Sequence, residues 1–233
     1  MNILAADTST TTLYLCLLTD TSKTSISISG GLQHSENLLP NIIKITDDQN
    51  LKLTDLDLLV CTKGPGSFTG LRIAMSALKG ISLASEIPLV AIETNKLLTI
   101  PVSFFDGTIM SVIDARKKRF YISLFNKKER ISKDLDINET EIINLISKEE
   151  KILITGLDSK KLYDKLLAAS IKEKLPNTKI LIDEARHDLG YHLAVLGKEE
   201  YEINGASPIG FGPSYIRKSD AEIALDKKRE KNI

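Results

Sequence analysis

The feature that most constrains the fold is an order of segments that occurs twice along the chain. In the first half, the periods of the apolar residues indicate three short strands followed by helix, strand, helix and strand. The second half repeats this order. An apolar run ends in Asp7 seven residues before Tyr14, and another ends in Asp114 seven residues before Tyr121. Two copies of one unit predict two lobes of similar construction.

Three strands in a row, followed by crossover helices and further strands, predict an α/β fold with mixed sheets flanked by helices, because parallel neighbours need a crossover. In the first copy we expect strands at Asn2–Ala6, Leu13–Leu18, Ser25–Ser29, Leu58–Thr62 and Leu89–Ile92, and helices from Ser35 and over Ser67–Ser85. In the second we expect strands at Thr108–Ile113, Phe120–Asn126, near Arg130–Leu135, Lys151–Thr155 and Lys179–Ile182, and helices at Glu139–Ser147, Ser159–Ala169 and Glu184–Leu196.

Such duplicated units resemble the ribonuclease-H-like lobes of the actin-like (ASKHA) superfamily. Pro101 and Gly107 interrupt the periodic pattern between the two copies. This interruption predicts an N-terminal lobe of residues 1–100 and a C-terminal lobe, with a tail, of residues 101–233.

The charge balance argues against a protein that binds nucleic acid by itself. The 233 residues include 31 Lys plus Arg and 31 Asp plus Glu, so the formal net charge is zero. Autonomous nucleic-acid binders usually carry a basic excess. The basic tail at Asp226–Lys231 is better explained as a solvated helix end than as a phosphate contact. Contact with tRNA is therefore expected to be indirect.

The chain shows no sign of export or membrane insertion. Its first residues lack the basic and apolar regions of a signal peptide, and no run approaches the roughly 18 apolar residues of a membrane span. Cys16 and Cys61 lie far apart in apolar runs, which predicts buried free thiols rather than a disulfide or CxxC site. A cytoplasmic protein without membrane contact is expected.

The histidines do not form a pattern that would bind a metal. They are His34, His187 and His192. No pair has the i, i+4 spacing that directs two imidazoles at one ion from a helix. We expect His34 to be partly exposed at a helix start that Ser35 caps. No metal site is predicted.

Two loops are candidates for phosphate binding. Gly64–Gly70 joins a strand to a helix, where free N–H groups and the helix dipole can hold an anion, but the Lys-Ser/Thr pair of a Walker A loop is missing. The alternative assigns its glycines to a tight turn and Ser67 to the N-cap.

The second loop is Asp7-Thr8-Ser9, which stands where actin-like ATPases carry a phosphate loop but lacks the glycine. Asp7, Thr8 and Ser9 are the candidate cofactor contacts. The second copy offers no glycine-rich partner loop, because the bulky, charged Arg116 stands two residues after Asp114, where such a loop would lie. We expect Asp7 and Asp114 to organise the turns after their strands by accepting backbone N–H bonds, and we predict no bound cofactor.

The helix from Ser67 is apolar almost all round. Its only charges are Arg72 and Lys79, so an additional surface should cover a second side of it. The preceding helix is also broadly apolar, and the two together could complete a bundle with another chain. The alternative is burial inside the monomer, between the sheet and the second lobe. The expected interface residues are Leu38, Leu39, Ile42, Ile45, Leu71, Arg72, Met75 and Leu78.

Motifs along nearly the whole chain resemble those of the TsaB (YeaZ) family. The N-terminal motifs are LAADTST from Leu4, QHSENLLP from Gln33 and GPGSFTGLRI from Gly64; the later ones are Ile113-Asp114-Ala115-Arg116 with Tyr121, and Pro213-Ser214-Tyr215-Ile216-Arg217. The GPGSFTGLRI string is long enough that a chance match is remote.

This resemblance implies a non-catalytic subunit required to form N6-threonylcarbamoyladenosine at position 37 of tRNAs that read ANN codons. The implied partners are a TsaD-type catalytic subunit, bound and activated through the N-terminal helices, and a TsaE-type ATPase; alone, the chain would form a homodimer. The paralogue TsaD carries two metal-binding histidines on the corresponding helix. Here only His34 is present, with Leu38 four positions on, so that metal site does not carry over.

Two other functions stay open at this point. An actin-superfamily ATPase or small-molecule kinase would use Asp7, Thr8 and the Gly64–Gly70 loop. A metallopeptidase would need a bound metal, for which no nucleophile, base and ligand set can be assembled from these residues.

Overall fold

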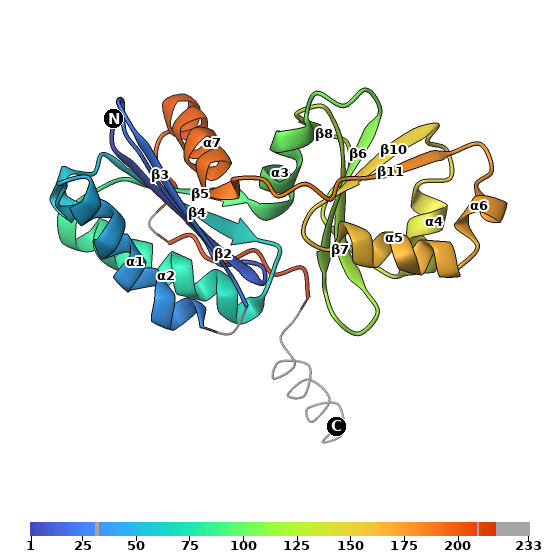
Figure 1. Cartoon of the computed structure of the whole chain (residues 1–233), viewed down its shortest axis with the longest axis horizontal. Helices are drawn as coiled ribbons and strands as arrows, with labels where there is room; N and C mark the ends of the chain where they lie inside the picture. The colour runs from blue at the N-terminus through green and yellow to red at the C-terminus, as the bar shows by residue number, and fades with distance from the viewer. Residues whose placement is uncertain (31–32, 209, 218–233) are drawn as a thin grey trace, which may run out of the picture.

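The computed structural model describes residues 1–30, 33–208 and 210–217, and it shows two lobes, each built on a mixed sheet with helices against it (Figure 1). The first sheet has the order β3-β2-β1-β4-β5. Its strands are β1 Ile3–Asp7, β2 Thr12–Leu18, β3 Lys23–Ser29, β4 Leu58–Gly64 and β5 Leu89–Glu93. The first three strands are antiparallel neighbours, whereas β4 and β5 continue parallel to β1, as expected.

The second sheet repeats this plan with a shorter third strand. Its order is β11-β10-β6-β7-β8, with β9 also paired to β7. The strands are β6 Thr108–Asp114, β7 Phe120–Asn126, β8 Glu129–Arg130, β9 Leu135–Ile137, β10 Lys151–Thr155 and β11 Lys179–Ile182. The expected α/β fold of two mixed sheets is confirmed.

Helices cover both faces of the first sheet. On one face lie α1 His34–Asp48 and α2 Phe68–Ser85, and on the other lie α7 Leu189–Asn204 and the short α3 Thr94–Thr99 (Figure 1). The buried strand β2 contacts both layers because its alternate residues point to opposite faces. The short 3-10 helices Leu53–Asp55 and Ile100–Val102 lie in connections.

Apart from α3, which contacts β6 and β7 from the other face, the second sheet has its helices on one face. These are α4 Glu139–Leu145, α5 Ser159–Ala168 and α6 Ile171–Lys174, which enclose a core with the inward residues of β6, β7 and β10. The opposite face carries a smaller cluster that includes Ile109, Phe125 and Leu153. The second lobe is therefore covered less evenly than the first.

Helix α7 lies elsewhere than chain order indicates. The expected division at residue 100 places it in the C-terminal lobe, yet Leu189, Leu193 and Ala194 pack on the first sheet. Small residues permit this approach: a Cβ added at Gly197 would lie 2.3 Å from the Val60 side chain. The order of the elements could not predict which sheet α7 covers, because both sheets have a face on which a C-terminal helix could pack.

The starts of the first two long helices differ from each other. Ser67 caps α2, since its Oγ accepts a hydrogen bond from the N–H of Gly70, as expected. Helix α1 instead begins one residue before Ser35, and its N-cap Gln33 makes no side-chain cap bond. His34 is buried rather than partly exposed, and its Nε2 lies 2.9 Å from the carbonyl oxygen of Thr10. The prediction for His34 and Ser35 was wrong.

Both cysteines are buried free thiols, as expected, on opposite faces of the first sheet. Burial raises the pKa of Cys16 to about 11 and that of Cys61 to about 12, so neither thiol is reactive at neutral pH. Within the described part of the chain, no helix has the length and apolarity needed to cross a bilayer. The basic stretch Asp226–Lys231 lies outside the described residues.

Candidate functional site

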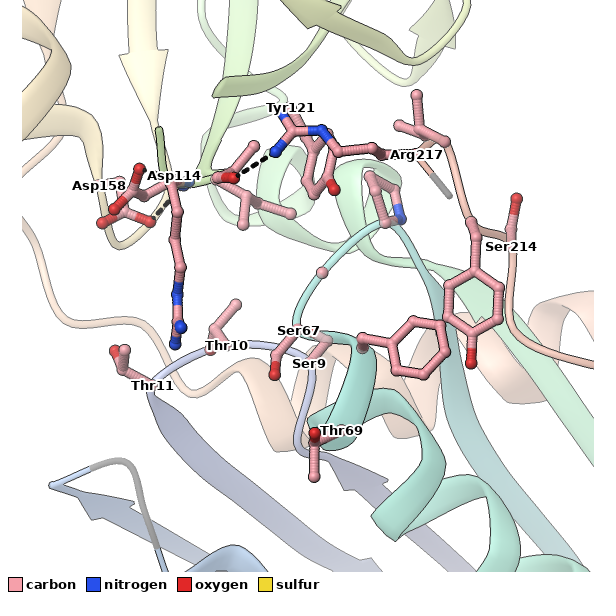
Figure 2. Close-up of a pocket in the computed structure, with 18 of the residues that line it drawn as sticks. Ser9, Thr10, Thr11, Ser67, Thr69, Asp114, Tyr121, Asp158, Ser214 and Arg217 are labelled. Carbon is pink, nitrogen blue, oxygen red and sulfur yellow. Dashed lines mark hydrogen bonds between the residues drawn. The ribbon is translucent and has the colours of Figure 1, made fainter. Parts of the chain in front are cut away.

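A cleft of about 350 Å³ opens between the two lobes. The loops after β1 and β4 form its first-lobe wall, and the turn after β6 faces them from the second lobe (Figure 2). A segment near the C-terminus, Ser214 to Arg217, closes one side. The cleft therefore brings together four of the sequence motifs: the loop after Asp7, the Gly64–Gly70 loop, Ile113 to Arg116 with Tyr121, and Ser214 to Arg217.

Asp7 stands beneath the first-lobe wall and is almost completely buried. Its Oδ1 accepts hydrogen bonds from the hydroxyl of Thr62, at 2.6 Å, and from the N–H of Ser9, at 2.8 Å. The bond from Ser9 is the turn-organising contact that the sequence predicts. Burial raises the pKa of Asp7 above its ordinary value of 3.8, although the bonds from Thr62 and Ser9 oppose this.

The side chain of Thr8 ties the first loop to α2. Its hydroxyl donates to the carbonyl of Gly70 at 2.6 Å and accepts from the N–H of Ala74 at 3.1 Å. The side chains of Asp7, Thr8 and Ser9 are each at most 1% exposed. The bonds of Asp7 and Thr8 serve the packing of the lobe, and neither residue lines the cleft. Ser9 does line it, and its buried Oγ has no hydrogen-bond partner among the described residues, so of the three candidate cofactor contacts only Ser9 lies at the cleft wall.

The glycines of the Gly64–Gly70 loop serve close packing. A Cβ added at Gly70 would lie 2.0 Å from the carbonyl oxygen of Thr8, and one at Gly66 would lie 2.5 Å from that of Ser9. The N–H of Ser67 donates to the same Ser9 oxygen at 2.7 Å. Each contact presses the loop against the end of β1, which favours the tight-turn explanation of this motif over phosphate binding.

The second-lobe wall is built around Asp114. Its Oδ1 accepts from the N–H of Arg116 at 2.9 Å, the same turn that Asp7 makes with Ser9. Its Oδ2 lies 2.6 Å from the ammonium of Lys161, and its N–H donates to Asp158 at 2.8 Å. Burial raises the pKa of Asp158, and the nearby Asp114 carboxylate adds to that rise. The sequence prediction for Asp114 is thus confirmed.

No cluster of three or more potential metal ligands occurs among residues 1–30, 33–208 and 210–217. His34 has Leu38 on the next turn, and that leucine is buried in the core. His187 lies 2.8 Å from the carboxylate of Asp183, a pairing that the sequence analysis did not anticipate. One carboxylate and one imidazole do not make a metal site.

The helix pair α1 and α2 shows a different outward face from the expected one. Six of the eight expected interface residues are at most 4% exposed: Leu38, Ile42, Ile45, Leu71, Met75 and Leu78. These residues form the regularly spaced apolar stripe of each helix, and in an amphipathic helix this stripe faces the core, here the first sheet. As surface contacts these six are corrected to core residues.

The apolar side chains that do face solvent on this pair are Leu39, Ile43 and Leu83, which are 49%, 54% and 72% exposed. Arg72 is exposed as expected, but its guanidinium stacks on Phe68 at 4.1 Å and its Nε donates to the hydroxyl of Tyr215. Of the expected interface residues, Leu39 and Arg72 alone lie on the surface. Ile43 and Leu83, which were not expected, are the other exposed candidates for an interface on this helix pair.

A family described as TsaD, tRNA N6-adenosine threonylcarbamoyltransferase, matches residues 18–225. The tRNA threonylcarbamoyladenosine biosynthesis protein TsaB of Bacillus subtilis is 29% identical over 230 residues, which cover 95% of this chain and 96% of that protein. The chain belongs to the TsaB (YeaZ) family. The TsaB of Haemophilus influenzae is 31% identical over 127 residues, 53% of each chain.

Solved structures agree on the fold of this family member. A Pseudomonas aeruginosa protein described as similar to the peptidase YEAZ aligns with a TM-score of 0.75 and 20% identity, covering 93% of this chain and 99% of that one. A putative N-acetylmannosamine kinase of Listeria monocytogenes aligns with a TM-score of 0.53 and 13% identity, over 87% and 100%. At these identities the likeness concerns the two-lobed architecture alone.

Proposed function

We propose that this TsaB family member is a non-catalytic subunit in the formation of threonylcarbamoyladenosine on tRNA. The pathway rests on the relatives named for it. In this proposal the chain binds and activates a TsaD-type subunit, with a TsaE-type ATPase as a third component, and it contacts tRNA only through them. The modified base would be adenosine 37 of tRNAs that read ANN codons.

The observation that carries the proposal is the apolar surface of the helix pair. Leu39 and Ile43 lie one turn apart on α1, and Leu83 lies near the C-terminal end of α2. Helix pairs with exposed apolar residues can complete a bundle with a second pair. Burying a few hundred Å² at about 25 cal/mol per Å² gives several kcal/mol before association costs. That gain is sufficient for a stable complex.

A second observation supports a binding role rather than catalysis. The polar side chains that the sequence offers for chemistry at the first-lobe loop, Asp7 and Thr8, make bonds within the lobe. A scaffold needs these groups only for folding. The helix pair, by contrast, is free to accept a partner without any rearrangement of the core.

The test substitutes a charge on the exposed face. Leu83→Glu and Ile43→Glu should each weaken capture of the TsaD-type subunit at least tenfold while the variants keep their wild-type melting temperature. Ile203→Glu is the matched control, because Ile203 is 77% exposed but lies on α7, on the other side of the sheet. Unchanged capture by both helix-pair variants would contradict the proposal.

The same face predicts the behaviour of the chain alone. Without its partner, the helix pair should bind a second copy, so the isolated protein should be a homodimer that Leu83→Glu converts to a monomer. Met75→Glu and Leu78→Glu would not serve this test. Both side chains are at most 4% exposed, so a charge there should unfold the lobe instead.

The competing function is an actin-like ATPase or small-molecule kinase, which the cleft between the lobes favours. Calorimetric titration of the isolated chain with Mg-ATP separates the two functions. Absence of binding together with full activity in a reconstituted tRNA modification assay supports the scaffold. Tight binding and turnover by the chain alone would support the enzyme.

A further inference from the structure

The described end of the chain runs from the first lobe to the second. We call residues 205–208 and 210–217 the strap. The covalent chain crosses between the lobes twice, after β5 and after β11, and the strap adds a third, non-covalent link along one side of the cleft (Figures 1 and 2). Its attachments to each lobe define what it can do.

The strap first lies along the open edge of the first sheet. The N–H of Ser207 donates to the carbonyl of Leu89 at 2.9 Å, and the N–H of Ala91 donates to the Ser207 hydroxyl at 3.0 Å. Strand β5 is an edge strand, whose unpaired backbone groups need partners. These bonds anchor the beginning of the strap to the first lobe.

Further along, the strap contacts the start of α2. The N–H of Ser214 donates to the carbonyl of Lys63, and a Cβ at Gly64 would lie 2.6 Å from the Ser214 carbonyl oxygen. The Tyr215 ring stacks on Phe68 with centroids 4.4 Å apart. Gly64 and Phe68, both in the loop motif, thus receive the strap.

Two residues later the strap reaches the second lobe. The Arg217 guanidinium donates from Nε and Nη2 to the two carboxylate oxygens of Asp136, both at 2.8 Å, and from Nη1 to the carbonyl of Ala115 at 3.1 Å. The two side chains are only 22% and 16% exposed, which strengthens a bidentate pair relative to one in open solvent. Burial opposes the charge on Asp136, but the bonds from Arg217 and Arg119 outweigh it and lower the pKa of that carboxyl.

We propose that the strap is a releasable latch, in which Tyr215 on the first lobe and Arg217 on the second hold the lobes closed over the cleft. The lobes stay joined at α3, where Asn95 donates to Asp134 at 2.8 Å and Arg130 pairs with Glu93 at 2.7 Å. Releasing Arg217 therefore lets the lobes rotate about that side. The latch sets both the interlobe angle and access to the cleft.

The native cysteines make the test direct, because both are fully buried and will not take a spin label. Cysteines introduced at the exposed positions Asp48 on α1 and Ala168 on α5 report the distance between the lobes by electron–electron double resonance. Labelled protein is diluted with an excess of unlabelled protein, so that only distances within one chain are measured, and the full-length wild type should then give one narrow distribution. Arg217→Ala should add a longer-distance component, raising the open population about tenfold or more for the loss of a charge-assisted pair. Tyr215→Ala should act in the same direction.

Arg119→Ala is the matched control. Arg119 donates to the same carboxylate, at 3.0 Å from Asp136 Oδ1, but its partners Asp136 and Glu141 lie in its own lobe, so it does not link the two lobes. It should leave the distribution narrow. Wild-type distances in both Arg217→Ala and Tyr215→Ala would overturn the latch, and so would equal broadening by Arg119→Ala. If Arg217→Ala does not fold, Arg217→Lys keeps the charge, loses the bidentate geometry and answers the same question.

Discussion

The two lobes use one turn in two electrostatic settings. After the first strand of each sheet, an aspartate Oδ1 accepts the N–H two residues on, from Ser9 in the first lobe and from Arg116 in the second. Asp7 is then buried with hydroxyl and amide partners, whereas the Asp114 side chain is 23% exposed and paired with Lys161. The duplicated backbone was kept while the side-chain surroundings diverged.

This difference between the two turns shows which interactions keep each of them rigid. In the first lobe, glycines and neutral hydroxyls hold the turn against α2 in the buried interior, where packing is close and substitutions are poorly tolerated. The second lobe uses carboxylates and lysines near solvent, where each pair contributes less. Substitutions at corresponding places should therefore have unequal effects.

The largest effect is expected at Gly70. Gly70→Ala would place a Cβ 2.0 Å from the backbone oxygen of Thr8, which cannot move without shifting β1, and should lower the free energy of unfolding by about 3 kcal/mol or more. Gly80→Ala on the same helix meets nothing within 4 Å and should stabilise by up to about 1 kcal/mol. Urea unfolding measures the free energy of unfolding of both variants. Equal effects of the two substitutions would contradict the close packing of Gly70 against Thr8.

An intermediate effect is expected from the buried carboxyl. Because burial raises the pKa of Asp7, the folded state binds the proton more tightly than the unfolded state, so the free energy of unfolding falls as pH rises above about 4. Asp7→Asn removes the titrating carboxyl. The free energy of unfolding of this variant, relative to that of the wild type, should therefore increase as the pH rises, by at most about 1.4 kcal/mol per pH unit. Unfolding curves between pH 4 and 7 test the sign, and parallel pH profiles would contradict it.

The smallest effect is expected in the second lobe. Lys161→Ala removes the partner of Asp114, and both side chains keep contact with water. The free energy of unfolding should change by less than about 1 kcal/mol, and less still in 0.5 M salt. A larger loss that salt does not reduce would show that the second turn is as intolerant as the first.

The period of apolar residues was enough to predict the two sheets, and the residue types at the ends of the elements were enough to predict the Ser67 cap and both aspartate turns, because each depends on local chemistry. The contacts of α7, Tyr215 and Arg217 depend on segments far away in sequence, 143 residues away for Tyr215 and 81 and 102 residues away for Arg217, and periodicity does not encode them. Burial of Leu38 and Met75 was missed for a related reason: an apolar helix face was assigned to another chain when its own sheet already covered it. The exposed positions Ile43 and Leu83 could have been found by asking which apolar residues fall off the inward stripe.

The position of α7 also constrains how the protein can be made. One layer of the first lobe comes from residues 189 to 204, so during synthesis the first sheet must wait with one face largely bare. At about 5 to 20 residues per second, the roughly 110 residues after β5 take on the order of 5 to 20 s to emerge. Over that interval the apolar residues that α7 covers in the finished lobe lack this cover, and the final closure of the lobe follows, rather than precedes, the synthesis of its neighbour.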